Sequence, residues 1–248
     1  MASAFLAARV IENKQWAENL FSIRLDVELQ AFKAGQFVRV QLTINGEAVA
    51  KPYSLVNSPS QETAEVFYNL VSDGPMSNGL AALKADDVIE ISQPAAGFFV
   101  LDEIPETQHL WMLATGTGLG PYLSILQDPA VWERFDKLVL VHAVSFADNL
   151  AYQPLINDFS VRNPSQFKYI PIVSREDHPN ALKGRIPALI SDGQLESAAR
   201  VTIDPKTTHF MLCGNQNMIA DARIVLAERG LSKHLRRKPG HITTEQYF

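Results

Sequence analysis

The sequence predicts two domains, an antiparallel β-barrel followed by an α/β domain with a parallel sheet. Before about residue 100, short extended runs alternate with turn signals, a pattern typical of small barrels or sandwiches. Beyond it, apolar strands alternate with segments that can be helical. At 248 residues, 46% of them hydrophobic, the chain is long enough for two cores. We expect residues 1–102 to form the barrel domain and residues 103–248 the α/β domain, divided near Asp102 to Glu106, a polar link that contains Pro105.

The barrel strands are predicted from β-branched and aromatic residues between turn signals. The Asn45-Gly46 pair is a hairpin turn signal. One short helix is expected over residues 77–83. The expected strands are residues 35–44, 50–56, 66–71 and 88–92.

The α/β domain is predicted from four apolar strands, each with a potentially helical segment behind it. Such a sheet is covered on both faces and binds ligands outside the carboxyl ends of its strands. The expected strands are residues 110–115, 138–144, 169–174 and 209–213. No repeat or low-complexity segment interrupts them.

Charge and cysteine content exclude several classes of protein. A net charge of −5 argues against nucleic acid as the default partner. The one cysteine, Cys213, excludes an internal disulfide, a cysteine-ligated iron–sulfur cluster and a cysteine-based zinc site, and we expect no metal. No apolar run approaches the roughly 20 residues that span a bilayer, and no signal segment is recognised, so we expect a soluble, cytoplasmic protein without a membrane partner.

Residues 51–59 and 115–121 carry the strongest functional signals. The first run places the cation Lys51, the ring of Tyr53 and the hydroxyl of Ser54 at a strand end, which suits a phosphate, a flavin face and a ring nitrogen. The second is a glycine-rich turn between strand and helix, where Gly116 and Gly118 permit close backbone approach to a phosphate. A turn without a ligand is the alternative, since Pro121 replaces the third glycine of G-x-G-x-x-G.

The nucleotide that such a turn would hold is predicted from the strands behind it. The strand ending at Val144 and Ser145 lacks the acidic residue that binds an unphosphorylated ribose. Arg175, after Ser174, and Arg185 could instead bind a 2′-phosphate, although strand-end arginines are more often in surface ion pairs. These residues favour NADP over NAD.

Both runs, together with Cys213-Gly214-Asn215 and the ending Glu245-Gln246-Tyr247-Phe248, resemble the bacterial ferredoxin(flavodoxin)–NADP reductases over nearly the whole chain. The resemblance implies FAD in the barrel domain and NADP(H) in the α/β domain, with a C-terminal tail that returns to the flavin. It also implies hydride transfer between the two cofactors and one-electron exchange with a separate ferredoxin or flavodoxin.

The resemblance carries site residues onto this sequence. Ser54 would lie near the flavin N5, Cys213 would position the nicotinamide, and Glu245 would polarise it or handle a proton. The residues expected at FAD are Lys51, Pro52, Tyr53, Ser54, Tyr68, Asn69, Leu70, Val71, Pro75, Met76, Ser77, Tyr247 and Phe248. Those expected at NADP(H) are Gly116, Thr117, Gly118, Val144, Ser145, Ser174, Arg175, Arg185, Asn215, Gln216 and Asn217.

Three positions depart from the family pattern. Lys51 and Ser145 stand where relatives have arginine, and Phe248 stands where many have tryptophan. The ammonium group of Lys51 is a point charge and lacks the two parallel donors of a guanidinium group. Ser145 leaves the adenosine end of the nucleotide with one cation fewer, and the ring of Phe248 offers less stacking area than tryptophan. Weaker NADPH and FAD binding is therefore expected.

Two alternatives to a ferredoxin/flavodoxin–NADP reductase remain open. A general NAD(P)H:flavin reductase or an oxygenase partner would use the same domains. A non-catalytic flavin or nucleotide sensor would not need Ser54, Cys213 and Glu245. The basic residues Lys233, Arg236, Arg237 and Lys238 are either solvated surface or a docking site for an acidic electron carrier. We expect a monomer.

Overall fold

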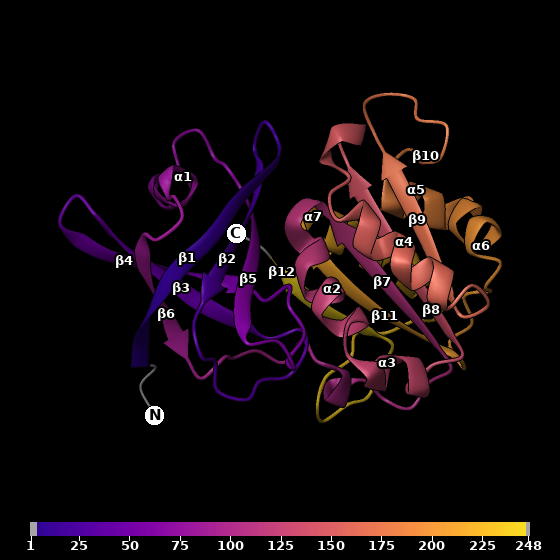
Figure 1. Ribbon diagram of the computed structural model, residues 1–248. Helices are drawn as coiled ribbons and strands as arrows, with labels where there is room; N and C mark the ends of the chain where they lie inside the picture. Colours follow the sequence, from indigo (N-terminus) through magenta and orange to yellow (C-terminus); the bar gives the residue numbers. More distant parts are fainter. Residues whose placement is uncertain (1–3, 247–248) are drawn as a thin grey trace. The chain divides into compact units, whose positions relative to one another are not determined.

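The computed structural model describes residues 4–246 and shows two compact units (Figure 1). The barrel unit holds the chain up to Leu101 together with Gly120–Asp128, and the α/β unit holds Asp102–Leu119 and the chain from Pro129 onward.

The barrel unit is one antiparallel sheet of six strands in the order β4-β3-β6-β1-β2-β5. A bridge between Leu55 and Val66 and the 2.8 Å hydrogen bond from Val56 N to Glu65 O join the region after β4 to β5, at opposite ends of that order. The sheet thus curls on itself, which confirms the antiparallel barrel. Its strands are β1 Ala4–Ala17, β2 Leu20–Asp26, β3 Phe37–Ile44, β4 Glu47–Ser54, β5 Thr63–Asn69 and β6 Val88–Gln93.

Alternate residues of these strands form the barrel core. Val10, Ile23, Val38, Val66 and Ile91 are fully buried and belong to one hydrophobic cluster. Successive side chains of a strand point to opposite faces, so a strand with one buried face buries every second residue. Asn45 and Gly46 both have positive φ, 53° and 83°, which confirms the tight turn between β3 and β4.

Two helices pack within the barrel unit. The helix predicted over residues 77–83 is α1, Pro75–Ala82, which buries Met76 and Leu80. Helix α2, Gly120–Leu126, is apolar and wholly buried. Tyr122 of α2 lies 5.7 Å from Phe99 between ring centroids, and Ser124 Oγ donates to Asn57 O at 2.7 Å.

The α/β unit has a six-stranded sheet in the order β10-β9-β8-β7-β11-β12, and every neighbouring pair is parallel. The predicted parallel sheet is therefore confirmed, with the short β10 and the C-terminal β12 as additional edge strands. The strands are β7 His109–Thr115, β8 Lys137–Val144, β9 Phe167–Val173, β10 Leu182–Lys183, β11 Thr208–Gly214 and β12 Ile242–Gln246.

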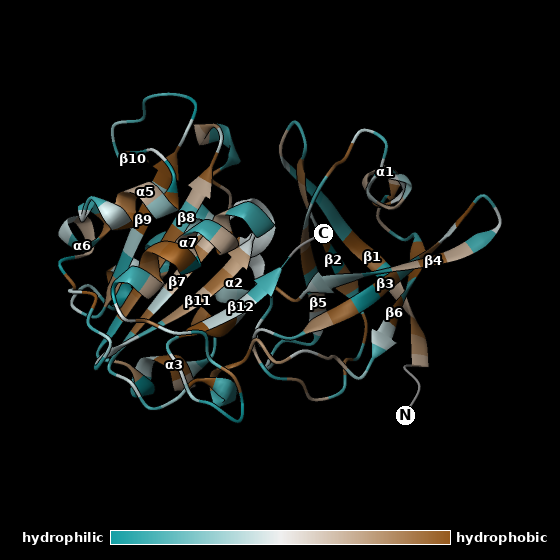
Figure 2. Cartoon of the chain, turned by 180° about the vertical axis from the view of Figure 1, so that it is seen from behind, coloured by the Kyte–Doolittle hydropathy of each residue, from teal (hydrophilic) through white to brown (hydrophobic). Residues whose placement is uncertain are grey.

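Helices cover both faces of this sheet. Helices α5, α6 and α7 cover one face, and their residues Ile186, Leu195 and Ile219 share one hydrophobic core with the strands. Helices α3 and α4 cover the other face, where Trp132 and Phe159 pack with Phe167. Figure 1 shows α4 over one face, and Figure 2 views the sheet from behind with hydrophobic segments along its strands. The helices are α3 Pro129–Arg134, α4 Gln153–Arg162, α5 Ile186–Ser191, α6 Gln194–Ala199 and α7 Gln216–Glu228; 3₁₀ turns span Leu101–Glu103, Gly116–Leu119 and Ala147–Asn149.

Within residues 4–246, no helix combines the length and the apolar character that crossing a membrane would require.

Candidate functional site

In the α/β unit, the parallel register places Cys213 and Glu245 side by side at the carboxyl edge of the sheet. Cys213 pairs with Ala114 on β7 and with Glu245 on β12. Paired residues of parallel strands point to the same face, so the thiol and the carboxylate share one face. Cys213 is fully buried and Glu245 is partly exposed.

The glycine-rich turn lies directly on β11. A Cβ added at Gly118 would lie 2.5 Å from Cys213 O, and Gly214, with φ of 127°, would bring a Cβ into Thr115 Oγ1. Thr115 Oγ1 also accepts a 2.8 Å hydrogen bond from Asn215 N. Gly118 is therefore needed for packing against a strand, a reason separate from the phosphate approach expected from the sequence.

His142 was missed by the sequence reasoning although it contacts this turn. Its side chain is fully buried, and its Nε2 lies 3.1 Å from Gly116 O. Burial lowers the pKa of His142 to about 4, so the ring is neutral at pH 7. The signal in the sequence is one polar residue within the apolar strand 138–144.

Asn215 caps helix α7. Its Oδ1 accepts from Asn217 N at 2.9 Å and from Met218 N at 3.3 Å, so this oxygen satisfies the helix end. The expected nucleotide contact of Asn215 is thus limited to its side-chain amide nitrogen, while Gln216 and Asn217 are exposed.

The two arginines expected at a 2′-phosphate follow neighbouring strands. Val173 of β9 pairs with Val144 of β8 and with Lys183 of β10, so these three residues form one row across the sheet. Arg175 follows Val173 by two residues, and Arg185 follows Lys183 by two residues. Ser145, one residue beyond that row, accepts a 3.0 Å hydrogen bond at its carbonyl from Arg175 N, and Ser174 donates through Oγ to Val144 O at 3.2 Å.

Both guanidinium groups are accessible. Arg175 and Arg185 are exposed, and neither forms an ion pair with any residue in the described range 4–246. Arg175 lies 5.7 Å from the Phe146 ring centroid. Among the described residues, neither side chain has the surface ion pair that was the alternative to a ligand contact.

In the barrel unit, residues 51–54, the start of the first run (residues 51–59), form the end of β4 and pair with β3. Lys51 and Pro52 are exposed, the ring of Tyr53 is partly exposed, and Ser54 is buried. Tyr53 meets Tyr68 edge to face, with ring centroids 6.4 Å apart. Burial raises the pKa of Tyr53 to about 12, so the phenol is neutral at pH 7.

Tyr68 supports Tyr53 from inside the barrel. It stacks on Phe21 at 5.7 Å and donates its hydroxyl to Asn13 Oδ1 at 2.9 Å. Asn13, which the sequence reasoning missed, also donates to the carbonyls of Leu80 and Leu83 at the end of α1. Asn13 thus ties α1 to the aromatic pair.

The segment from Asn69 to Ser77 leads into α1. Gly74 is the N-cap of this helix and forms no side-chain cap bond. Ser77, the third residue of the helix, is buried, and its Oγ accepts from Val71 N at 3.0 Å and lies 3.1 Å from Gly74 O. The hydroxyl closes the preceding turn. Asn69, Val71 and Pro75 are exposed, Leu70 is partly exposed and Met76 is buried.

Tyr247 and Phe248 lie outside the described residues. Glu245 and Gln246 end β12, which pairs with β11 up to Gly214.

The basic segment 233–238 is exposed at its charged positions. Leu235 and Lys238 form an antiparallel bridge that places Arg236 and Arg237 at the tip of a turn. Arg236 is ion-paired with Glu103 at 2.5 Å.

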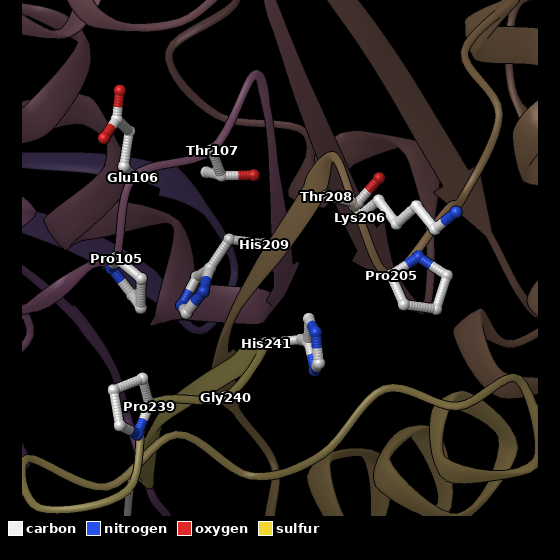
Figure 3. Close-up of a pocket in the computed structure, with 10 residues that line it drawn as sticks. All are labelled: Pro105, Glu106, Thr107, Pro205, Lys206, Thr208, His209, Pro239, Gly240 and His241. Carbon is white, nitrogen blue, oxygen red and sulfur yellow. The ribbon is translucent and has the colours of Figure 1, made fainter.

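The α/β unit also has a cavity of about 170 Å³ at the opposite, amino edge of its sheet (Figure 3). His209 in its lining is buried, with Nε2 2.9 Å from Thr243 Oγ1. None of the predicted site residues lines this cavity. The lining residues are Pro105, Glu106, Thr107, Pro205, Lys206, Thr208, His209, Pro239, Gly240 and His241.

Comparison with known proteins finds two oxidoreductase domain families in the chain. A family model for an oxidoreductase FAD-binding domain matches residues 7–99, and one for an oxidoreductase NAD-binding domain matches residues 112–223. The flavodoxin/ferredoxin–NADP reductases of Shigella flexneri and Escherichia coli (strain K12) are 46% and 45% identical, over 98% of this chain and 99% of theirs.

A solved structure extends the likeness to three dimensions. The ferredoxin NADP⁺ reductase from Neisseria gonorrhoeae with bound FAD and NADP is 32% identical and matches with a TM-score of 0.93, over 98% of this chain and 99% of that one. The predicted fold class and the resemblance stated from the sequence are confirmed. The chain therefore belongs to the flavodoxin/ferredoxin–NADP reductase family.

Proposed function

We propose that this protein is an FAD-dependent reductase that exchanges a hydride with NADP(H) and single electrons with flavodoxin or ferredoxin. The observation that carries the choice of nucleotide is the pair of exposed arginines, Arg175 and Arg185, at neighbouring strand ends without ion-pair partners among residues 4–246. Guanidinium groups suit a 2′-phosphate. The Neisseria gonorrhoeae relative, which has FAD and NADP bound, supports both cofactors.

The barrel residues fit a flavin. Tyr53 offers a partly exposed neutral ring that Tyr68 holds from inside, and a flavin can stack on such a ring. Lys51 is an exposed cation three residues before the buried hydroxyl of Ser54, which suits a phosphate and a polar ring edge. Bound FAD supplies the chemistry, because it takes up a hydride and releases electrons one at a time.

The residues of the α/β unit would orient the nicotinamide. Gly118 and Gly214 keep the loop and β11 close together, since a methyl group at either position would meet backbone or Thr115. Cys213 and Glu245 share one face at the strand end, where the thiol would set the ring position and the carboxylate would polarise its amide. Water exclusion at the buried Cys213 would favour hydride transfer over loss to solvent.

Rapid mixing of the purified protein with NADPH or NADH, without oxygen, tests this function. We expect fast loss of flavin absorbance that is strongly selective for NADPH. Equal rates with the two nucleotides would favour a general NAD(P)H:flavin reductase or an oxygenase partner. A flavin that neither nucleotide reduces would indicate a sensor, and the absence of flavin would overturn the proposal.

Arg175→Ala and Arg185→Ala test the nucleotide assignment. Each variant should weaken NADPH binding about tenfold or more and leave NADH binding within about twofold, because charged hydrogen bonds to the 2′-phosphate contribute about 1.5–3 kcal/mol. Arg162→Ala, which removes an exposed arginine from α4, is the control. Equal losses for NADPH and NADH would show that these arginines do not read the 2′-phosphate.

The exposed cations Lys233, Arg237 and Lys238 would dock the acidic carrier, and Arg236 would hold their turn through Glu103. Arg237→Glu with Lys238→Glu should slow electron transfer to ferredoxin or flavodoxin at low salt, with hydride uptake from NADPH unchanged. Lys168→Glu, at an exposed amine on β9, is the control. An unchanged salt dependence would remove this docking site.

The proposed working form is a cytoplasmic monomer. Sedimentation equilibrium of the flavoprotein tests its association state, and a stable dimer would correct it.

A further inference from the structure

His142 is a buried polar residue in an otherwise apolar strand. In β8 it pairs with Ala114 on one side and Pro171 on the other. Neither neighbour has a polar side chain, and the imidazole is fully buried. A buried polar group costs free energy unless it is hydrogen-bonded, so the group that it contacts explains its presence.

That group is the carbonyl of Gly116, 3.1 Å from Nε2. A carbonyl oxygen only accepts, so Nε2 carries the proton. Nδ1 has no hydrogen-bond partner among the described residues, which fits a neutral ring with its proton on Nε2. The lowered pKa of His142 keeps this donor in the same form at neutral pH.

Gly116 is where the turn needs such a restraint. Its φ of 53° is in the left-handed region, and glycine also leaves the backbone more conformational freedom than other residues. The C=O and N–H of one trans peptide point in opposite directions. Holding Gly116 O toward β8 therefore turns the N–H of Thr117 away from β8. That amide lies in the first turn of a 3₁₀ helix, where N–H groups lack partners within the helix.

The opposite side of the turn is fixed by β11, through the hydrogen bond from Asn215 N to Thr115 Oγ1 and the close approach of Gly118 to Cys213. We propose that His142 is a positioning residue for dinucleotide binding, which holds the Gly116 carbonyl so that the Thr117 amide stays directed at the nucleotide pyrophosphate. This inference rests on the proposed function and assigns a role within its nucleotide loop, residues 115–118.

Two substitutions separate the hydrogen bond from packing. His142→Gln keeps a side-chain N–H donor at similar reach, whereas His142→Met fills a similar volume without one. Leu138→Ala, a fully buried position at the other end of β8, is the control for general loss of stability. The measurements are calorimetric dissociation constants of the flavoprotein for NADP⁺ and NAD⁺, thermal midpoints, and ¹⁵N shifts of the imidazole.

We expect His142→Met to weaken NADP⁺ and NAD⁺ by the same factor, roughly five- to tenfold, because the loop contacts a part that both share. His142→Gln should bind within about twofold of the unchanged protein. Leu138→Ala should lower the thermal midpoint without weakening binding by more than about twofold. The ¹⁵N shifts should show a neutral ring protonated at Nε2.

Other outcomes overturn the role of His142. Unchanged binding in His142→Met, equal weakening in Leu138→Ala, failure of His142→Gln to restore affinity, or a proton on Nδ1 would each do so. Weaker binding of NADP⁺ alone would also contradict it, because NADP⁺ differs from NAD⁺ only in its 2′-phosphate and both contain the pyrophosphate. If the protein without substitutions bound no dinucleotide, the proposed function itself would fail. If all variants bound as well as that protein, only the role of His142 would fail.

Discussion

Ser54 is a buried hydroxyl at the end of β4, next to the partly exposed ring of Tyr53. Its hydroxyl can hydrogen-bond a ring nitrogen at the edge of a stacked flavin. Ser54→Ala should slow flavin reduction by NADPH about tenfold, which corresponds to about 1.4 kcal/mol in the barrier. Single-turnover absorbance measures this rate.

Ser22→Ala is the matched control for Ser54. Ser22 is also a buried serine of the barrel unit, and its hydroxyl accepts from Trp16 Nε1 at 3.0 Å. This control should lose some stability and retain the rate. Rates that are the same in Ser54→Ala and the unchanged protein would remove Ser54 from the proposed mechanism.

At the scale of single elements, the glycine-rich turn, residues 115–121, contains two kinds of glycine. A Cβ at Gly118 would lie 2.5 Å from the carbonyl oxygen of Cys213, whereas one at Gly120 would lie 3.5 Å from Val56 Cγ2, an ordinary contact. Gly118→Ala should therefore weaken NADP⁺ binding at least about tenfold and lower the thermal midpoint, because two backbone segments must separate.

Gly120→Ala is the control in the same turn. Alanine favours a helix by up to about 1 kcal/mol over glycine, so this variant should be as stable as the unchanged protein or more so. Calorimetric binding and thermal unfolding of the two variants test the difference. Equal behaviour would show that the loop tolerates a side chain against β11.

The predicted strands and the glycine-rich turn follow from local patterns, whereas the roles of Cys213 and Glu245 were implied by the family resemblance. Several other features follow from neither. Strands β1 and β2 were missed because charged residues such as Arg9, Glu12 and Arg24 hide their alternation on exposed positions. β12 requires a partner, β11, about 30 residues earlier in the chain. The contact between His142 and Gly116 likewise depends on the pairing of β7 with β8, which one segment cannot reveal.

At the scale of the whole molecule, two compact units allow two unfolding transitions, so one free energy of unfolding need not describe the chain. Both strongly shifted histidines, His142 and His209, belong to the α/β unit. Burial lowers the pKa of His142 to about 4; burial, then His234, His241 and Arg134, lower that of His209 to about 3. Acid should therefore act on this unit through both side chains.

The sign follows from proton binding in each state. In the unfolded chain both histidines titrate near pH 6.5, while in the folded unit they stay neutral to about pH 4 and about pH 3. Between about pH 6.5 and pH 4 the unfolded state binds more protons, so the stability of the α/β unit falls as pH falls. Near pH 5 these two groups should contribute a difference of about two protons.

Tryptophan fluorescence can follow this unit, because Trp111 and Trp132 lie in it and Trp16 lies in the barrel unit. In a Trp16→Phe background, urea unfolding between pH 7 and pH 5 gives the proton difference from the slope of stability against pH. His142→Gln or His209→Gln should each reduce that difference by about one proton. A slope that neither substitution alters would show that these two side chains do not control acid unfolding.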